Sequence, residues 1–366
     1  MKNGKLQIGI IGCGGIANNK HFPSLAKLSG LCEMVAFCDI IEDRAQKAAA
    51  TFGTKDAKVY TDYKQLLDDG AIDVVHVLTP NVAHGPITVD ALAAAKHVMC
   101  EKPMAHNSAD AKKMLDAARK AGKKLTIGYQ NRFRDDTQTL YRACQAGALG
   151  DIYFAKAHAV RRRAVPTWGV FPNKALQGGG PLIDIGTHAL DITLWMMNNY
   201  KPKSVTGSVF YKMADKFEGN VFGPWDPATF EVEDSAFGFI KMENGATIFL
   251  ESSWALNTTD AKEAATTLCG TEAGAEIKGG IGTGDYELTL NMAKFGKLMT
   301  EKPAGASGVA YFSGGSNEPG FLEAKQWLEA VINDTEPLVK PEQAFVVTQI
   351  LEAIYMSHSS GKTIVL

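Results

Sequence analysis

Short β-branched runs alternate with longer alanine-rich segments of helical period over roughly the first 125 residues. This alternation is typical of βαβ units, which build a parallel sheet with helices on both faces. The runs predict strands at 6–11, 34–39, 73–78, 97–100 and 125–128. The intervening segments predict helices at 45–52, 63–68, 85–95 and 108–121. We therefore expect a doubly wound sheet that binds its ligand at the carboxyl ends of the strands.

The pattern changes after Gly128. A helix near 136–146 precedes runs that predict strands at 151–161, 204–213, 234–242, 246–254, 264–269 and 274–277. Strands that follow one another without helices between them favour an antiparallel sheet. Further helices are expected at 182–198, 320–333 and 341–358, and long loops at 213–231 and 278–319.

The expected fold class is α/β followed by α+β. We predict a Rossmann domain with a doubly wound parallel sheet at 1–128 and a larger C-terminal domain at 129–366, joined by a hinge near 125–130. The second domain is expected to be built on an open, mostly antiparallel sheet. A chain of 366 residues exceeds the usual size of a single core, which agrees with two domains.

Composition narrows the class of partner. The chain has 38 Lys and Arg against 40 Asp and Glu, without a long run of one sign, so no nucleic acid or membrane surface is expected as a partner. No apolar leader precedes the first strand, and no apolar stretch is long enough to span a bilayer. The six cysteines lack zinc-site spacing and a C-x-x-C pair. We expect a cytoplasmic protein with free thiols and no metal.

A glycine turn follows the first strand. Gly12-x-Gly14-x-x-Ala17 between a strand and a helix is a dinucleotide-binding fingerprint, in which Gly12 permits the turn and Gly14 lets the backbone approach a pyrophosphate. The phosphates would meet the N–H groups that begin the helix. This predicts cofactor contacts from Gly12, Cys13, Gly14, Gly15 and Ile16.

Asp39 ends the second strand, about 20 residues beyond the fingerprint, where an acidic side chain accepts hydrogen bonds from the ribose hydroxyls of the adenosine. It would repel a 2′-phosphate, and Ile40 supplies no cation to offset that repulsion. NAD is therefore predicted over NADP, although Arg44 leaves the choice open. The alternative is a structural glycine turn beside a solvated aspartate.

The tripeptide Glu-Lys-Pro occurs at 101–103 and again at 301–303. Lys102 directly follows a predicted strand, so its side chain should emerge at the edge of the sheet where a nicotinamide would lie. Glu101 and Lys102 are predicted to contact the cofactor, and Pro103 is a candidate for a cis bond. Lys302 has no such anchor and is expected at the solvated surface. An exposed lysine at a strand end is the alternative for Lys102.

Asp184, His188 and Asp191 follow the turn 178–181 at spacings of four and three, which places them on one face of a helix. The helix dipole favours the ionised form of Asp184, and the flanking carboxylates could fix the tautomer of His188. A histidine satisfied within the core is the alternative. Carboxylates on an otherwise apolar helix are costly without partners or a function, so this group is a catalytic candidate.

Weaker candidates come from loops and aromatic positions, where a structural turn or a core side chain is the alternative. For the cofactor they are Thr79, Pro80, Asn81, His84, Gln130 and Trp168, and for the substrate Tyr129 and Arg163.

Together these residues resemble the glucose–fructose oxidoreductase, inositol dehydrogenase and rhizopine-catabolism (Gfo/Idh/MocA) family over nearly the whole chain. The resemblance rests on the glycine turn, 78–81, Glu101-Lys102-Pro103, 131–133 and the Asp184-x-Gly-x-His188-x-x-Asp191 helix. It implies a homodimer, homotetramer or higher homo-oligomer formed through the open sheet. It also implies NAD(P)-dependent chemistry on a secondary hydroxyl of a sugar or cyclitol, with Lys102, Asp184 and His188 as the catalytic set. A transcriptional repressor in the family lacks this catalytic set, so the presence of the set in this chain favours an enzyme.

Within the family, three segments of this sequence resemble dehydrogenases of glycosides more than inositol enzymes. They are 161–163, 166–169 and the insertion 213–231. A pyranoside is then the expected substrate, with oxidation at C3 because a 3-keto sugar can eliminate its aglycone. Aromatic residues of the insertion could cover the aglycone or pack against a neighbouring subunit; they are Phe217, Phe222, Trp225 and Phe230. An inositol dehydrogenase and a non-catalytic NAD-binding sensor are the alternative functions.

The expected reaction transfers hydride from a ring CH–OH to NAD. His188 is the predicted general base, Lys102 would stabilise the developing alkoxide, and Asp184 would hold an adjacent hydroxyl and orient the base. Lys102 with a pKa lowered by burial is the alternative base.

Overall fold

The computed structural model describes residues 1–281, 284–304 and 318–366, which form two compact units. The first unit contains Met1–Phe133 and the described residues of Ser313–Phe345, and the second contains the described residues of Arg134–Phe312 together with Val346–Leu366. The chain therefore returns to the first unit after the second sheet. The sequence pattern, which predicts one domain over 129–366, contains no signal for this return.

The first unit is built on a six-stranded sheet in the order β3-β2-β1-β4-β5-β6, with all strands parallel. The strands are β1 (Leu6–Ile11), β2 (Cys32–Cys38), β3 (Lys58–Tyr60), β4 (Val74–Val77), β5 (His97–Cys100) and β6 (Leu125–Ile127). This order confirms the predicted doubly wound fold, in which the strand order reverses between β1 and β4. The edge strand β3 was not predicted, because three residues are too few to produce a periodic pattern.

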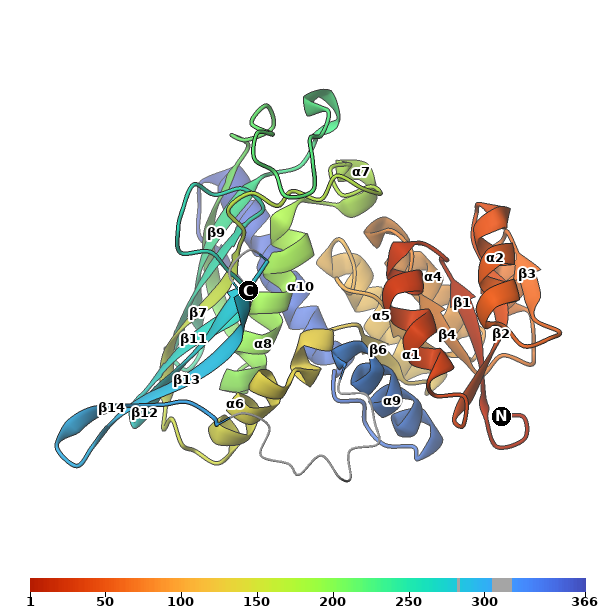
Figure 1. The fold of residues 1–366 in the computed structure, drawn as a ribbon, viewed down its shortest axis with the longest axis horizontal. Helices are drawn as coiled ribbons and strands as arrows, with labels where there is room; N and C mark the ends of the chain where they lie inside the picture. The colour runs from red at the N-terminus through yellow and green to blue at the C-terminus, as the bar shows by residue number, and fades with distance from the viewer. Residues whose placement is uncertain (282–283, 305–317) are drawn as a thin grey trace. The chain divides into compact units, whose positions relative to one another are not determined.

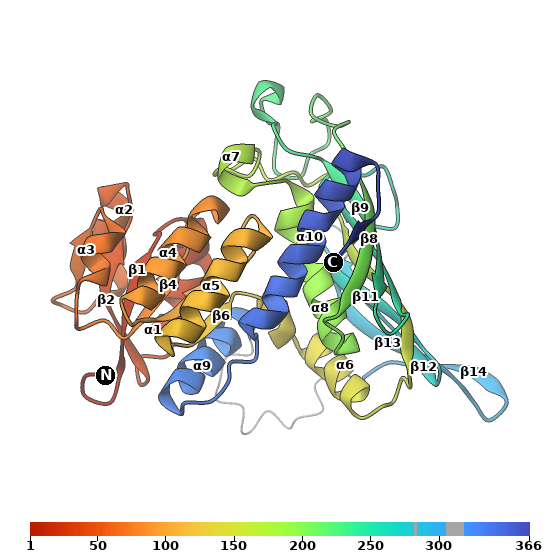
Figure 2. The same cartoon turned by 180° about the vertical axis from the view of Figure 1, so that it is seen from behind.

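Helices cover both faces of this sheet. They are η1 (Ala17–His21, a π-helix), α1 (Phe22–Ala26), α2 (Glu42–Phe52), α3 (Tyr63–Leu67), α4 (Asn81–Ala93), α5 (Ser108–Ala121), η2 (Gln130–Phe133) and α9 (Pro319–Ile332). Buried residues of α1, α2 and α9, such as Leu25, Ala45 and Trp327, share one core with β1. Figures 1 and 2 show α4 and α5 side by side on the face away from α1.

The second unit contains a nine-stranded sheet in the order β14-β13-β12-β11-β7-β10-β9-β8-β15. The strands are β7 (Ile152–Val160), β8 (Pro202–Phe210), β9 (Ser235–Met242), β10 (Thr247–Ser253), β11 (Lys262–Gly270), β12 (Ala273–Gly280), β13 (Gly284–Lys294), β14 (Lys297–Glu301) and β15 (Ile364–Val365). The strand pairs are antiparallel except β7 with β10, which confirms the predicted mostly antiparallel sheet.

The predicted loop over 278–319 is wrong where β13 and β14 lie. Every residue of β14 is exposed, so that strand lacks the alternation of apolar and polar residues that reveals a half-buried strand. The remainder of that prediction, at 282–283 and 305–317, lies outside the described residues.

The helices of the second unit are α6 (Asp135–Gln145), α7 (Lys174–Gln177), η3 (Leu182–Gly186, a π-helix), α8 (Thr187–Met197), η4 (Pro227–Thr229) and most of α10 (Pro341–Ser360). Figure 1 shows α8 packed along the sheet, where it contacts β7 and β11. A Cβ at Gly207 or Gly238 would lie 2.7 or 2.5 Å from Ile354, so these two glycines let α10 approach the backbone of β8 and β9. The helix predicted at 182–198 is confirmed by η3 and α8, and its first turn has π geometry.

Alternate residues of the central strands point away from α8. Phe237, Phe239 and Phe249 line a groove of about 710 Å³ on that face, and Phe249 is 45% exposed. The family resemblance implies an interface between copies of the chain on this open face.

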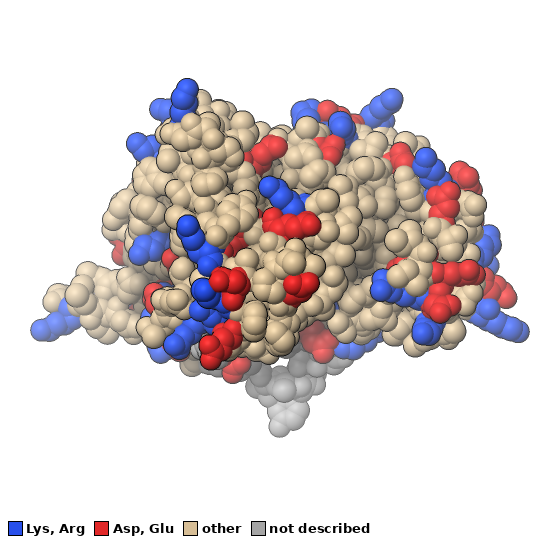
Figure 3. Space-filling model, turned by 90° about the horizontal axis from the view of Figure 1, so that it is seen from above, with Lys and Arg blue, Asp and Glu red and all other residues tan. Residues whose placement is uncertain are grey.

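Charged side chains of both signs are interspersed on the face drawn in Figure 3. Among the residues that the structure describes, no helix is long and apolar enough to cross a membrane.

Candidate functional site

The carboxyl ends of β1, β2, β4 and β5 lie along one edge of the first sheet and carry predicted cofactor residues. Gly12 follows β1, Asp39 follows β2, Thr79 lies two residues beyond β4, and Glu101 follows β5. Gly12 has φ 98°, and a Cβ there would lie 2.5 Å from the Leu78 carbonyl oxygen. Only glycine therefore allows the turn after β1 to lie this close to the end of β4.

The glycine turn leaves its backbone accessible. A Cβ at Gly14 or Gly15 would meet nothing within 4 Å, so the second and third glycines are not required by packing within the chain. The Asn18 side chain donates to the carbonyl oxygens of Cys13 and Gly14 at 3.0 and 2.8 Å. The turn is thus fixed from one side and open on the other.

Asp39 has a structural contact that the sequence did not reveal. The residue is 8% exposed, and its carboxylate accepts the main-chain N–H groups of Cys13 and Ile41, both at 2.9 Å. It therefore joins the glycine turn to the end of β2, and each oxygen keeps a second lone pair for a ligand. Ile40 is 91% exposed and Arg44 is exposed on α2.

The loop after β4 contains an unsatisfied group. The Thr79 hydroxyl is buried and has no hydrogen-bond partner among the described residues, whereas buried hydroxyls are normally paired. His84, which is 1% exposed, places its ring nitrogens 2.8 Å from the Pro103 carbonyl and 2.9 Å from the Thr79 carbonyl. The His84 ring thus lies between the loop after β4 and the Pro103 carbonyl. Burial lowers the pKa of His84.

Glu101 is buried at the end of β5. Its Oε1 lies 2.6 Å from Lys20 Nζ and 2.8 Å from His21 Nε2, and its Oε2 accepts the main-chain N–H of Lys102 at 3.0 Å. Burial opposes ionisation, but Lys20 and His21 hold the pKa of Glu101 well below its usual range. The contacts of Glu101 are therefore with its own chain, and a direct contact with a cofactor remains a prediction.

The two Glu-Lys-Pro tripeptides differ as predicted. The Lys102–Pro103 bond is cis, and Lys102 is partly buried. Lys302 is 57% exposed and pairs with Glu287, which confirms its surface position.

In the second unit, Asp184 lies on η3 and His188 on α8, one turn further along. The indole N–H of Trp254 donates to Asp184 Oδ2 at 3.0 Å. Asp184 and His188 are partly exposed, whereas Asp191 is 1% exposed. Asp184 and His188 are therefore the members of the predicted group that remain accessible to a ligand.

The glycine turn before this helix is close-packed. A Cβ at Gly180 would lie 2.2 Å from the Glu233 carbonyl oxygen, and one at Gly179 would lie 2.1 Å from the Tyr355 hydroxyl. The buried Glu233 carboxylate accepts from Gly180 N–H at 2.8 Å and from Tyr355 at 2.7 Å. These contacts fix the direction in which the helix with Asp184 begins.

Trp254 also connects Asp184 to an aromatic cluster, defined as Trp168, Phe171, Phe222, Trp225, Phe230 and Trp254. Ring centroids are 4.7 Å apart for Trp168 and Phe222, 6.3 Å for Phe171 and Trp254, and 6.4 Å for Phe230 and Trp254. Trp168 is 51% exposed, while Trp254 has no exposed surface.

Burial differs between two further candidates. Tyr129 has no exposed surface in this structure, and its contact with substrate stays a prediction. The Nη1 atom of Arg163 is buried and lacks a hydrogen-bond partner within the described chain, which leaves a donor for a ligand. Gln130 lies on η2 and is partly buried.

The insertion 213–231 packs on its own unit. The Asn220 side-chain oxygen accepts Val165 N–H at 2.8 Å, and the Thr167 hydroxyl donates to the Phe222 carbonyl at 2.7 Å. At the base of the insertion, the buried Asp234 carboxylate accepts the main-chain N–H groups of Lys212 and Met213. The insertion therefore lies over the segment that carries Trp168.

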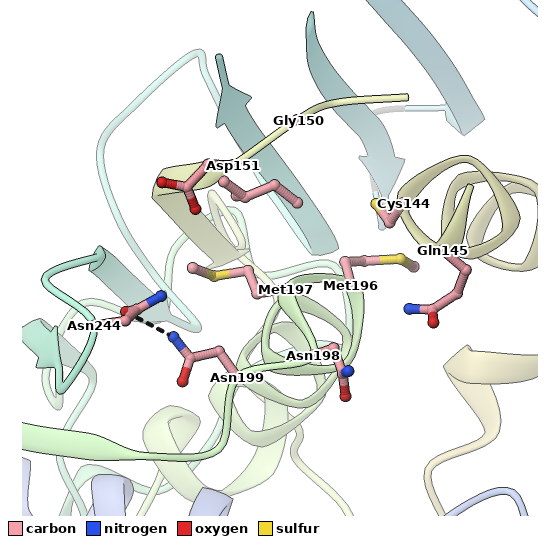
Figure 4. A pocket seen from close by; sticks show the side chains of 10 residues that line it. Cys144, Gln145, Gly150, Asp151, Met196, Met197, Asn198, Asn199 and Asn244 are labelled. Atoms are coloured by element: carbon pink, nitrogen blue, oxygen red, sulfur yellow. Dashed lines mark hydrogen bonds between the residues drawn. The ribbon is translucent and has the colours of Figure 1, made fainter. Parts of the chain in front are cut away.

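Two pockets of the second unit lie apart from the predicted site residues. Figure 4 shows one of about 260 Å³ lined by amide, thioether and other side chains, where Asn199 donates to Asn244 at 3.0 Å. None of the predicted residues lines this pocket or the groove on the open sheet face. No cluster of three His, Cys, Asp or Glu suited to a metal occurs within 1–281, 284–304 and 318–366.

Comparison with known proteins follows the two units. Residues 6–129 match the model of an oxidoreductase family with an NAD-binding Rossmann fold, and residues 137–276 match the GFO/IDH/MocA C-terminal domain. The chain is 37% identical over 365 residues to D-glucoside 3-dehydrogenase of Escherichia coli (strain K12), covering 99% of this chain and 97% of that protein. It is 32% identical over 202 residues to inositol 2-dehydrogenase of Salmonella typhimurium (strain LT2), covering 55% of this chain and 57% of that protein.

Solved structures agree in fold. The aldose-aldose oxidoreductase from Caulobacter crescentus complexed with glycerol has a TM-score of 0.80 at 25% identity, covering 99% of this chain and 100% of that one. Levoglucosan dehydrogenase in complex with NADH and levoglucosan has a TM-score of 0.81 at 20% identity, covering 99% of both chains.

The contacts of Asp234 give a testable expectation. Asp234→Ala leaves the N–H groups of Lys212 and Met213 without their acceptor, so the insertion should open more often. We expect cleavage within 213–231 by a nonspecific protease to accelerate roughly thirtyfold, since the two lost bonds together weaken the closed state by about 2 kcal/mol. Glu243→Ala, at an exposed turn, is the control. Equal cleavage rates in the two variants would show that Asp234 does not anchor the insertion.

Proposed function

Because the chain belongs to the Gfo/Idh/MocA family of NAD-binding oxidoreductases, we propose that it oxidises the C3 hydroxyl of a pyranoside to a ketone. The observation that carries the substrate class is the 37% identity to D-glucoside 3-dehydrogenase over 99% of the chain. The partly exposed Asp184 and His188 supply groups suited to the proton chemistry.

The first unit fits a dinucleotide. The open space at Gly14 and Gly15, the spare lone pairs of Asp39 and the unpartnered Thr79 hydroxyl are the features that a bound dinucleotide would use. Further proposed contacts come from Cys13, Ile16, Pro80, Asn81 and Gln130, as the sequence predicts. NAD, when bound, supplies the acceptor for the hydride that leaves the ring carbon.

Side chains of the protein would accept the hydroxyl proton and stabilise the negative charge of the alkoxide. We propose that His188 accepts the hydroxyl proton, that the Lys102 cation stabilises the alkoxide that forms, and that Asp184 holds an adjacent hydroxyl. The hydrogen bond from Trp254 fixes the Asp184 carboxylate for this task. Lys102 as the base remains the alternative.

The aromatic cluster supports a glycoside over a free cyclitol. It is joined to Asp184 through Trp254, and it exposes Trp168 on the same unit. An aromatic aglycone could pack against Trp168 and Phe222, whereas inositol has no such group. Trp225 is buried and donates to the Ala214 carbonyl, so it supports the insertion from within.

Two other functions remain as alternatives. The inositol dehydrogenases match about half of the chain, which keeps a cyclitol as the second candidate substrate. A non-catalytic NAD sensor is the candidate from another class. We further propose a cytoplasmic homo-oligomer that associates through the open sheet face.

Cofactor choice tests the role of Asp39. We expect kcat/KM to be at least about tenfold higher with NAD than with NADP, because the carboxylate repels a 2′-phosphate. Asp39→Ala should narrow this ratio and also weaken the binding of NAD, since Cys13 N–H loses its acceptor. Glu42→Ala removes a nearby exposed charge as a control. Comparable efficiency of the wild-type protein with both cofactors would contradict the assignment.

Substitution of the proposed catalytic residues separates an enzyme from a sensor. Lys102→Ala and His188→Ala should each lower kcat by about 10²-fold or more, while the Kd for NAD stays nearly constant. Lys302→Ala changes the lysine of the other Glu-Lys-Pro and should leave kcat unchanged. A wild-type protein that binds NAD but reduces none of it across a broad screen of glycosides and polyols would favour the sensor.

Substrate competition tests the aromatic cluster. An aryl glucoside should show a higher kcat/KM than myo-inositol, and Trp168→Ala should lower it by roughly tenfold for the aryl glucoside but not for methyl glucoside. Tyr153→Ala, an exposed aromatic position outside the cluster, is the control. Faster turnover of myo-inositol would return the assignment to an inositol dehydrogenase.

A further inference from the structure

A buried polar cluster lies beneath Lys102 in the first unit. It consists of Lys20 and His21 from η1, His76 from β4, Glu101 from the end of β5 and Glu323 from α9. Lys20 Nζ lies 2.6 Å from Glu101 Oε1 and 2.8 Å from Glu323 Oε2, with the three side chains between 4 and 10% exposed. Lys20 therefore forms ion pairs with two carboxylates that come from distant parts of the chain.

The two histidines complete the cluster as neutral groups. Burial lowers the pKa of His21 and lowers that of His76 well below its usual range. His21 Nε2, at 2.8 Å from Glu101 Oε1, must donate to the carboxylate. Its Nδ1 is then an acceptor for the Nδ1–H of His76 at 3.2 Å. Lys20 and His21 of η1 thus contact Glu101 directly, and His76 of β4 is linked to Glu101 through His21.

Glu101 in turn contacts the backbone of the proposed catalytic lysine. Its Oε2 accepts the Lys102 N–H at 3.0 Å, so the position of the carboxylate sets the place from which the Lys102 side chain projects. Lys20 also lies on the helix that directly follows the glycine turn. The cluster therefore joins the end of β5, where Lys102 lies, to η1, while Asp39 and Asn18 hold the glycine turn itself.

We propose that Lys20 is a positioning residue for Lys102, acting through Glu101. The proposal rests on the proposed function of Lys102. Burying a lysine and two glutamates costs desolvation that an apolar trio would avoid, so stability gives little reason for the cluster. A role in catalysis gives a reason, because Glu101 lies one residue before Lys102. A small displacement of a group that stabilises a transition state reduces the rate.

The first test compares Lys20→Met with Lys27→Met. Lys27 lies beside the same helical segment and pairs with Glu318 next to α9, but its side chain is 44% exposed. Lys20→Met should lower kcat by roughly tenfold with little change in the Kd for NAD, and Lys20→Arg should restore most of the loss. Lys27→Met should leave kcat unchanged.

A double-mutant cycle distinguishes positioning from general support. In the Lys102→Ala background, Lys20→Met should have no further effect on kcat, because the group that it positions is gone. An equal loss in both backgrounds would show a purely structural cluster. Should Lys20→Met fail to fold, the Lys20→Met/Glu323→Gln protein removes one charge of each sign, so it keeps the net charge of the cluster and should show the same coupling.

Amide exchange provides a readout that needs no substrate. Hydrogen exchange of the Lys102 N–H should accelerate in Lys20→Met, since Glu101 no longer has its fixed place, and stay unchanged in Lys27→Met. Unchanged exchange in Lys20→Met would overturn the proposal even in an active enzyme. Accelerated exchange in a protein that oxidises no pyranoside would support the positioning role and reject the proposed function.

Discussion

An ionised carboxylate is stable inside a protein only where cations and N–H donors replace the water that it has lost. Glu101 meets this condition through Lys20, His21 and the main chain of Lys102, which lie on η1 and at the end of β5, while Glu323 brings α9 to the same lysine. Three segments that are distant in the sequence are therefore fixed together at the carboxyl edge of the first sheet. The position of the lysine proposed for catalysis follows from that requirement.

The same principle recurs at the other loops that surround the candidate residues. Asp39 joins the glycine turn to β2, Glu233 joins the turn before η3 to α10, and Asp234 holds the base of the insertion. In each case a buried carboxylate accepts main-chain N–H groups that a loop would otherwise leave unpaired. Asp184 differs, because it is partly exposed and receives an indole N–H from Trp254, so it combines a fixed orientation with access to a ligand.

Local signals were sufficient to predict much of the fold and part of the site. The glycine turn, Asp39, the surface position of Lys302, the helix with Asp184 and His188, and both sheet types follow from short motifs and periodicity. The strands β3 and β14 did not, because short or fully exposed strands lack a hydrophobic pattern. The strand β13 was missed although Leu288 and Leu290 alternate with polar residues along it. Lys20 and Glu323 were also beyond prediction, since their pairing depends on the return of α9 to the first unit. The burial of Tyr129 likewise depends on tertiary packing.

In the proposed reaction, hydride leaves C3 of a pyranoside ring and is transferred to NAD. The most direct measurement is a turnover with an aryl glucoside that carries deuterium at C3, followed by NMR of the reduced cofactor. We expect deuterium at C4 of the nicotinamide and a 3-keto glycoside without the label. Unlabelled NADH, with deuterium retained in the oxidised sugar, would contradict it.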